Sequence, residues 1–345
     1  MSKNEAILRV EQSIEAIKNG EMIIIMDDED RENEGDLVMA GIFSTPDKIN
    51  FMAQYARGLI CVSITEKIAN DLDLPPMVAS NSSNHNTAFT ISIDAKEAKT
   101  GISAYERSLT IELMCRANAK PDDFVRPGHI FPLVAKEGGV LERTGHTEAS
   151  IDICKLAGLK PVSVICEIMK EDGLMARRDD KFLIDFASKH SLKILYVSDL
   201  IEYRMQSENL VSIQSEESSS FFDFDVTKTS FKDHIGRIHI AYKFGDTSKI
   251  PYVKFHIVDE DILLLEDFSR FNELVKSIDI LKEHVGYLVF LRTSKNSDIK
   301  ELGIGAQILK LLGILDFKLI SSTKNEDSFM VLNGFNLKIV EVIKP

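Results

Sequence analysis

The chain has 345 residues, with 54 acidic and 41 basic side chains, which gives a formal net charge of −13 at pH 7. This length is too great for a single ordinary core, so two domains are predicted. The acidic balance argues against a nucleic-acid or membrane partner and favours a small molecule. No apolar run approaches membrane-spanning length, and the first residues lack the basic and apolar blocks of a signal peptide, which predicts a cytoplasmic protein.

The first predicted elements lead into a strongly acidic loop. Apolar residues at helical spacing predict a helix over residues 7–18, and Met22–Met26 (MIIIM) is typical of a buried strand. Seven of the ten residues of Asp27–Asp36 (DDEDRENEGD) are carboxylates, and Leu37–Ala40 resumes the apolar pattern. The loop therefore follows the carboxyl end of a strand, which is where ligands bind in helix-flanked sheets. Its carboxylates repel one another unless cations lie among them.

Two interpretations of this loop remain open from the residues alone. It is either a solvated acidic turn or a site for a metal ion or a sugar. A calcium-binding hand is excluded. With Asp30, Glu32, Glu34 and Gly35 at its first, third, fifth and sixth positions, the twelfth position falls on Gly41, which has no carboxylate.

The middle of the chain predicts further helices and strands from the same periodicities. Ser103 and Glu106 match a capping box, Thr147 is a predicted N-cap, and Gly158 stands just past the end of the helix that Thr147 opens. Predicted helices cover about residues 45–58, 103–118, 147–157, 182–189 and 199–205, and predicted strands cover residues 59–64, 87–93, 130–135, 162–168 and 193–197.

Two histidines stand in Gly-His motifs. Arg126-Pro-Gly-His129 predicts a rigid turn before a strand, and Arg143-Thr-Gly-His146 leads into a helix. A helix start beside an arginine suits a phosphate group, although a plain cap with a solvated arginine is the alternative. Glu167 interrupts an otherwise apolar strand, where a charge is costly unless it is used.

The four cysteines, Cys61, Cys115, Cys154 and Cys166, lie far apart without CxxC spacing. This pattern argues against a disulfide framework or a thiolate zinc site and predicts buried, small apolar side chains.

Several segments together resemble one enzyme family. The segments are DDEDRENEGD, TAFTISIDA (Thr87–Ala95), TGISA (Thr100–Ala104), RPGHIFPL (Arg126–Leu133), RTGHTEASIDICKLAG (Arg143–Gly158) and CEIMKEDGLMAR (Cys166–Arg177). Over about residues 5–205 they resemble the motifs of 3,4-dihydroxy-2-butanone 4-phosphate synthases. These riboflavin-pathway enzymes convert D-ribulose 5-phosphate to L-3,4-dihydroxy-2-butanone 4-phosphate and formate.

The resemblance implies an α/β (α+β) domain with a mixed sheet and flanking helices, a homodimer with active sites near the subunit interface, and two Mg²⁺ or Mn²⁺ ions per active site. It implies that Glu32 and His146 hold the metal. Two positions depart from the family pattern, which has aspartate in place of Glu106 and glycine in place of Asn86. The residues implied in substrate binding are Arg31, Glu32, Asp36, Arg143, Thr144, Gly145, His146, Thr147 and Glu167, and those implied in catalysis are His129, Glu167, Glu34 and Asp27.

Three segments of the last part of the chain are His234–Tyr242 (HIGRIHIAY), Tyr252–His256 (YVKFH) and Leu302–Ile314 (LGIGAQILKLLGI). On these motifs the chain resembles GTP cyclohydrolase II from about Phe221. The family's three zinc cysteines are missing between Ile257 and Leu274, and its GTP loop is altered over Arg292–Asp298. The resemblance therefore implies a degenerate, smaller α/β domain without zinc and without GTP hydrolysis, kept for assembly or regulation. A bifunctional enzyme that also opens GTP is the alternative. The predicted domains are residues 1–206 and 221–345, joined by a linker over 207–220.

Overall fold

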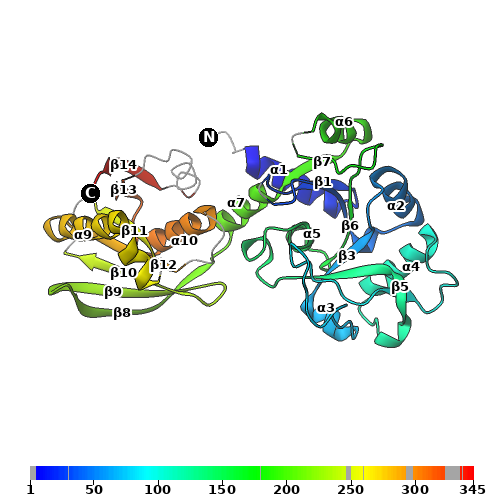
Figure 1. Ribbon diagram of the computed structural model, residues 1–345, viewed down its shortest axis with the longest axis horizontal. Helices are drawn as coiled ribbons and strands as arrows, with labels where there is room; N and C mark the ends of the chain where they lie inside the picture. Colours follow the sequence, from blue (N-terminus) through cyan, green and yellow to red (C-terminus); the bar gives the residue numbers. More distant parts are fainter. Residues whose placement is uncertain are drawn as a thin grey trace. The chain divides into compact units, whose positions relative to one another are not determined.

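The structure, a computed structural model, describes residues 5–29, 31–178, 180–245, 250–258, 260–292, 298–322, 335 and 337–345. Asp30 and most of the segment Arg292–Asp298, both considered in the sequence, lie outside the described residues. The chain divides into two compact units, Met1–Tyr203 and Arg204–Pro345, and the described part of each contains a seven-stranded sheet with flanking helices (Figure 1). The predicted α/β class with a mixed sheet is confirmed.

The sheet of the first unit has the strand order β4-β5-β3-β6-β2-β1-β7. β1 pairs antiparallel with β2 and parallel with β7, and β2 pairs antiparallel with β6, so neighbours of both senses occur. The strands are β1 (Ile23–Met26), β2 (Gly35–Ala40), β3 (Cys61–Thr65), β4 (Ile93–Ala95), β5 (Phe124–Ala135), β6 (Val162–Glu167) and β7 (Lys193–Tyr196).

Helices cover both faces of this sheet. α5 and α1 pack together on one face, while α2, α4 and α6 contribute to the core on the other, and Figure 1 shows α5 opposite α2 and α4. The described helices are α1 (Glu5–Lys18), α2 (Pro46–Phe51), α3 (Glu66–Asp71), α4 (Ala104–Cys115), α5 (His146–Leu156), α6 (Lys181–His190) and α7 (Val197–Ser207), with short turns η1 (Gly41–Phe43), η2 (Met52–Ala56), η3 (Pro121–Asp123) and η4 (Gly139–Leu141).

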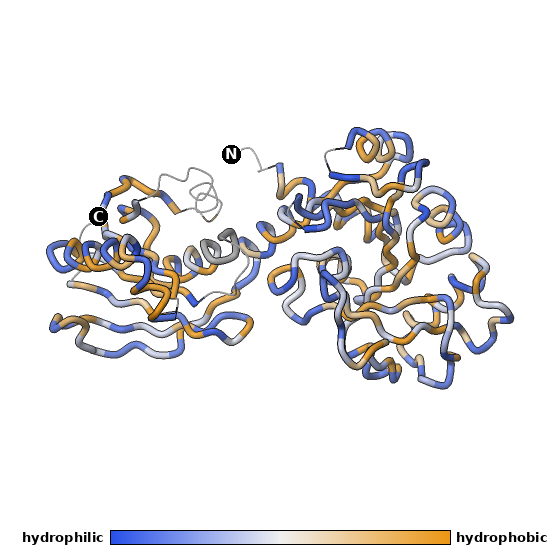
Figure 2. The backbone as a smooth tube through the Cα atoms, viewed as in Figure 1, coloured by the Kyte–Doolittle hydropathy of each residue, from blue (hydrophilic) through white to orange (hydrophobic). Residues whose placement is uncertain are grey.

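Alternation along the central strands decides which side chains face α5. Leu37 and Met39 of β2, and Val164 and Cys166 of β6, belong to the core shared with α2, α4 and α6. Because successive side chains of a strand point to opposite faces, the residues between them face α5. Both faces are buried, and Figure 2 shows the central strands as hydrophobic. Asp36, near the start of β2, and Glu167, at the end of β6, therefore lie on the face toward α5.

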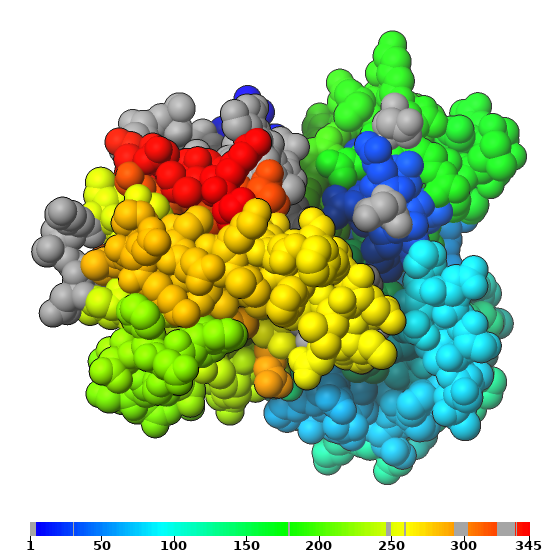
Figure 3. Space-filling model, turned by 60° about the vertical axis from the view of Figure 1, so that its left-hand side comes forward, coloured from blue at the N-terminus to red at the C-terminus, as the bar shows by residue number. Residues whose placement is uncertain are grey.

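The second unit has the strand order β14-β13-β11-β12-β10-β9-β8. Its outer strands β8 to β10 are antiparallel, whereas β11 to β14 pair in parallel. Atoms of α8 and α9, yellow to orange, occupy the middle of this unit's visible face in Figure 3. The elements are β8 (Val211–Phe221), β9 (Phe224–Asp233), β10 (Ile238–Phe244), β11 (Tyr252–Val258), α8 (Asp261–Glu266), α9 (Phe268–Glu283), β12 (Gly286–Arg292), α10 (Asp298–Leu311), β13 (Asp316–Ile320) and β14 (Lys338–Ile343).

The prediction of a linker over residues 207–220 is wrong for most of that range. Its residues from Val211 onward form β8, which pairs with β9 at the edge of the second sheet. Most side chains of β8 are exposed, so the strand needs no apolar alternation. Its serine- and glutamate-rich sequence therefore looked like a linker.

The turn predicted at Arg126–His129 is also wrong, because these residues lie inside β5. The strand predicted over Thr87–Ile93 is reduced to β4 and isolated bridges at Phe89 and Thr90. Proline has no N–H to donate, so Pro132 only accepts a hydrogen bond from the Thr90 backbone N–H, at 2.9 Å, and the pairing on this side of β5 is irregular.

The capping box at Ser103 is only half formed. The Ser103 hydroxyl accepts from the Glu106 backbone N–H at 3.2 Å, as predicted. The Glu106 carboxylate instead accepts from the backbone N–H groups of Lys99 and Thr100 at 2.7 and 3.2 Å. The hydrogen bond from Lys99 holds the pKa of Glu106 at about 2. Glu106 thus fixes the turn before α4, in agreement with a structural role.

The described residues contain no helix long and apolar enough to cross a membrane. All four cysteines are free and buried in the first unit, as the sequence predicts.

Candidate active site

Asp27 organises the acidic loop from the end of β1. Its fully buried carboxylate accepts from the backbone N–H groups of Glu32 at 3.1 Å and Glu34 at 2.8 Å. These bonds fold the loop back on itself before β2 begins. Ligand atoms of Asp27, Glu32 and His146 then lie within 4.8 Å of one another. The loop and the start of α5 therefore converge on one point.

Three arginines offset part of the loop's negative charge. Arg31 Nη1 lies 2.7 Å from both Asp27 Oδ2 and Glu32 Oε2. Arg177, which follows β6, donates to the Glu32 carbonyl oxygen at 2.5 Å and to Glu34 Oε1 at 3.3 Å. Arg178 bonds Asp28 Oδ1 at 2.8 Å. The sequence reasoning missed Arg177 and Arg178 as loop partners, and the only signal for them was the basic pair at the end of the motif after β6.

Asp36 and Glu167 are direct partners in the β2–β6 register. Both follow the alternation that faces α5, so they lie on the side where His146 begins that helix. Asp36 Oδ1 lies 3.9 Å from His146 Nε2, and Glu32 Oε2 lies 3.5 Å from His146 Nδ1. Glu167 Oε2 accepts from the Leu59 backbone N–H at 2.8 Å.

Burial and neighbouring charges separate the pKa values of these groups. Burial raises the pKa of Asp36 to about 8 and also raises the pKa of Glu167. Burial lowers the pKa of His146, but the charge of Asp36 and the contact with Glu32 outweigh it and raise the pKa to about 9. Burial opposes ionisation of Glu32 as well, yet His146 and Arg31 bring its pKa down to about 2. Ionised and protonatable carboxyls therefore stand side by side.

The donor set fits a divalent cation. Asp36 Oδ1 and His146 Nε2 are buried side-chain atoms without a hydrogen-bond partner among the described residues. Buried polar atoms normally have partners, so this gap suits a bound ion or substrate oxygen. Carboxylate oxygens with one imidazole suit Mg²⁺ or Mn²⁺. Asp27 already accepts three hydrogen bonds, which leaves Glu32 and His146 as the more available ligands.

Arg143 stands beside the start of α5. Its Nη1 lies 2.6 Å from Glu148 Oε2, and its Nη2 donates to the His85 carbonyl oxygen at 3.1 Å. α5 begins at His146 with Gly145 at the N-cap, so the prediction of Thr147 as the cap is wrong. A Cβ at Gly145 would collide with Arg143 Nη1 and meet Arg31 Nη2 at 3.0 Å.

The glycine at the N-cap thus lets two guanidinium groups approach one helix start, where the backbone N–H groups also favour an anion. Thr144 lies in the same turn, and Thr147 is buried in the first turn of α5. Glu148, which is almost fully buried, was missed from the sequence because an acidic residue in a first helical turn is commonplace.

His129 is bonded elsewhere. Its Nδ1 lies 2.8 Å from Asp94 Oδ2, and its backbone N–H donates to Asp94 Oδ1, also at 2.8 Å. No hydrogen bond or ion pair among the described residues joins His129 to the acidic loop. The imidazole side chain is 45% exposed. Asp94, which orients it, was not singled out from the sequence.

Cys61 starts β3 on the same face as Asp36, in an environment that disfavours its thiolate form. Burial raises the pKa of its thiol, and the charges of Glu167 and Asp36 raise it further. The thiol therefore stays protonated near neutral pH.

Comparison with known proteins identifies the chain. The family model of 3,4-dihydroxy-2-butanone 4-phosphate synthase matches residues 11–203. The synthase of that name from Helicobacter hepaticus is 63% identical over 97% of this chain and 99% of the relative. The chain belongs to the 3,4-dihydroxy-2-butanone 4-phosphate synthase family. The predicted enzyme class, a lyase of riboflavin biosynthesis, is confirmed.

Solved members of the synthase family agree with this assignment. A two-domain synthase from A. baumannii superposes with a TM-score of 0.84 at 40% identity, covering 98% of this chain and 99% of that one. A synthase in complex with two magnesium ions gives a TM-score of 0.54 at 39% identity, covering 57% of this chain and 97% of that one.

The second unit also has named relatives. The GTP cyclohydrolase II family model matches residues 259–344, which confirms the predicted likeness. The riboflavin biosynthesis protein RibBA of Aquifex aeolicus is 42% identical over 96% of this chain and 91% of the relative.

Proposed function

We propose that the first unit converts D-ribulose 5-phosphate to L-3,4-dihydroxy-2-butanone 4-phosphate and formate with the help of a divalent cation. The convergence of Glu32 and His146, with His146 Nε2 buried and lacking a partner, carries this proposal. The related synthase that binds two magnesium ions supports it. The substrate contains all the atoms of the two products, so no oxidant or second substrate is needed.

The reaction must enolise a ketose, lose water, migrate a carbon, take up water again and release formate, so it needs several proton-transfer groups. A divalent cation, when bound, supplies a Lewis acid for the substrate oxygens. Glu167 Oε2 is held by Leu59, which leaves Oε1 to take or return a proton. Asp36, on the neighbouring strand, has a pKa that lets it hold a proton near neutrality. The two carboxyls can therefore act on adjacent substrate atoms.

The Arg143 guanidinium and the N-terminus of α5 are proposed to bind the substrate phosphate. Replacing Arg143 by alanine is expected to raise KM for ribulose 5-phosphate about 10- to 100-fold with a smaller change in kcat, since one charged hydrogen-bonding group contributes roughly 1.5–3 kcal/mol. Arg143→Lys, which keeps a charge opposite Glu148, should be intermediate. Arg116→Ala, at the exposed C-cap of α4, is the matched control. An unchanged KM in Arg143→Ala would remove the phosphate assignment.

A homodimer is also part of this proposal. His129, a proposed catalytic residue, is bonded to Asp94 and not to the acidic loop of its own chain. A second copy that brings its His129 to the loop would reconcile this position with a catalytic role. Light scattering of the pure protein should give twice the 38.7 kDa chain mass. A monomer with full turnover would contradict the dimer.

The second unit is proposed not to hydrolyse GTP. A catalytic zinc site needs three protein ligands, and no cysteine follows Cys166. Both ring nitrogens of His239 are engaged, with Asp233 Oδ2 at 3.1 Å and the Arg292 backbone N–H at 3.2 Å. This pairing makes His239 a structural residue.

Formate release from ribulose 5-phosphate and from GTP, assayed separately with zinc analysis of the full-length protein, tests both proposals. Formate is expected from ribulose 5-phosphate alone, without stoichiometric zinc. Sustained GTP turnover with bound zinc would establish the bifunctional alternative.

A further inference from the structure

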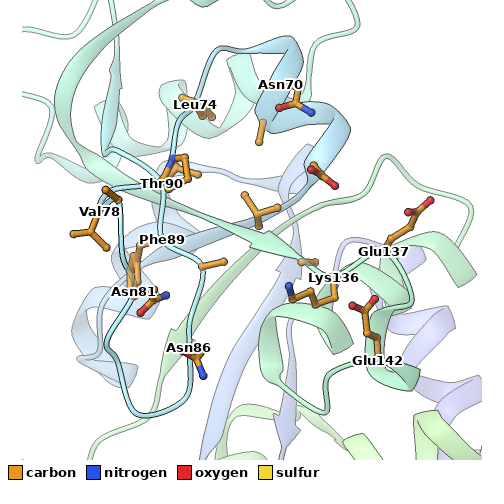
Figure 4. A pocket seen from close by; sticks show the side chains of 17 residues that line it. Asn70, Leu74, Val78, Asn81, Asn86, Phe89, Thr90, Lys136, Glu137 and Glu142 are labelled. Carbon is orange, nitrogen blue, oxygen red and sulfur yellow. The ribbon is translucent and has the colours of Figure 1, made fainter. Parts of the chain in front are cut away.

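A second hollow in the first unit lies apart from the acidic loop. It has a volume of about 740 Å³ and lies between α3, the segment 74–90 and the turn that follows β5 (Figure 4). Neither the carboxylates of the acidic loop nor His146 nor Glu167 lines it. A hollow of this size can hold a small molecule with more than one ring.

The two ends of this pocket differ in chemistry. At one end Leu74, Val78 and Phe89 lie together with the polar side chains of Asn81 and Thr90. Figure 4 shows the charged side chains of Lys136, Glu137 and Glu142 gathered at the other end. Leu74 is buried, so the first end offers an apolar floor and an aromatic ring. An occupant should therefore have a flat apolar part and a polar part.

The polar end disfavours anions. Glu66, Glu137 and Glu142 line the pocket together with a single ammonium group, that of Lys136. The carboxylates outnumber the cation, so a phosphate group would be repelled. Within the described chain no hydrogen bond or ion pair joins the Glu137 side chain to another residue. Hydroxyl groups of a ligand can donate to it in place of water.

Both walls of the pocket are connected to Arg143. The segment 81–90 forms one wall, and Arg143 Nη2 donates to the His85 carbonyl oxygen in that segment. Lys136 belongs to the other wall, and its backbone N–H donates at 3.1 Å to Glu148, whose second oxygen holds Arg143. A molecule that spans the pocket would fix Arg143 on these two partners and keep its guanidinium from turning toward the substrate phosphate at the start of α5.

We propose that this pocket binds an uncharged heteroaromatic molecule bearing several hydroxyl groups, of the size and kind of riboflavin, the end product of the pathway in which the family acts. Its binding raises KM for ribulose 5-phosphate and leaves kcat unchanged. The effect on KM, but not the binding itself, rests on the role proposed above for Arg143.

Riboflavin and its phosphate ester FMN are matched probes, because they differ only in one anionic group. In a fluorescence titration of the full-length protein, riboflavin should bind saturably, and FMN about tenfold more weakly. Glu137→Lys should weaken riboflavin binding and reduce the difference between the affinities for riboflavin and FMN. Glu97→Lys, at an exposed position outside the pocket, makes the same charge change and should leave both affinities unaltered.

Three results would overturn the inference: no saturable riboflavin binding, equal affinity for FMN, or identical behaviour of Glu137→Lys and Glu97→Lys. Turnover of ribulose 5-phosphate without flavin is measured in parallel. Normal turnover without riboflavin binding would reject the flavin site and leave the proposed function standing. Riboflavin binding without turnover would reject the proposed function and leave the flavin site standing.

Discussion

Glu32→Gln and His146→Ala are each expected to lower turnover of ribulose 5-phosphate at least about 100-fold, because each removes a ligand from the same cation site. Both variants should also require more Mg²⁺ for half-maximal activity, and EDTA should abolish activity of the wild type. The fold should persist, since Asp27 and its hydrogen bonds hold the loop without either side chain. Formate release over a Mg²⁺ titration measures both effects.

The matched control for this pair is Glu29→Gln. Glu29 belongs to the same acidic loop, but it is exposed and no hydrogen bond or ion pair joins it to another described residue. The substitution changes the charge of the loop by the same amount as Glu32→Gln, and turnover should stay within about twofold of wild type. Near-normal turnover in Glu32→Gln would show that the loop does not hold the cation through that residue.

Gly58→Ala is the second change expected to have a large effect. A Cβ at Gly58 would collide with the Glu167 carbonyl oxygen and lie 2.6 Å from Glu167 Oε2 and 2.8 Å from its backbone nitrogen. Two of these atoms are backbone, so the end of β6 must move. We expect a loss of about 1–3 kcal/mol in the free energy of unfolding. The displaced Glu167 should lower kcat by about 100-fold.

Gly35→Ala provides the control. The added Cβ would lie 3.0 Å from Leu183 Cδ1, the far end of a flexible side chain that can move. Its cost should stay below about 1 kcal/mol. Urea unfolding followed by circular dichroism, with kcat from formate release, compares the two variants. Equal unfolding midpoints and equal kcat values would show that the contact between Gly58 and Glu167 has no consequence.

The central strands could be predicted because they are buried on both faces. β1, β2 and β6 therefore appear as nearly continuous apolar runs that local pattern detects. β8 could not be predicted in this way, because an exposed edge strand has no core face to impose alternation. The irregular pairing beside β5 also escaped detection, since it depends on which residues lie opposite Pro127 and Pro132.

The residue types of the candidate site could be predicted from the sequence, but not which side chains lie next to one another. The acidic loop predicts that positive charge lies near it, but its sequence does not show that Arg177 and Arg178 approach it from a segment far along the chain. The adjacency of Asp36 and Glu167 follows from the strand register, which no local pattern contains. The placement of His129 beside Asp94 likewise follows from tertiary pairing.

The cysteines are distributed so that their chemical reactivity reports on the unfolding of the first unit. All four thiols are buried there, and the second unit has none. Burial raises the pKa of each thiol, so none reacts as a thiolate in the native state. The rate at which a thiol-modifying reagent labels the protein therefore reports unfolding of the first unit alone. Comparing this labelling rate with the rate at which the whole chain loses secondary structure shows which unit unfolds first.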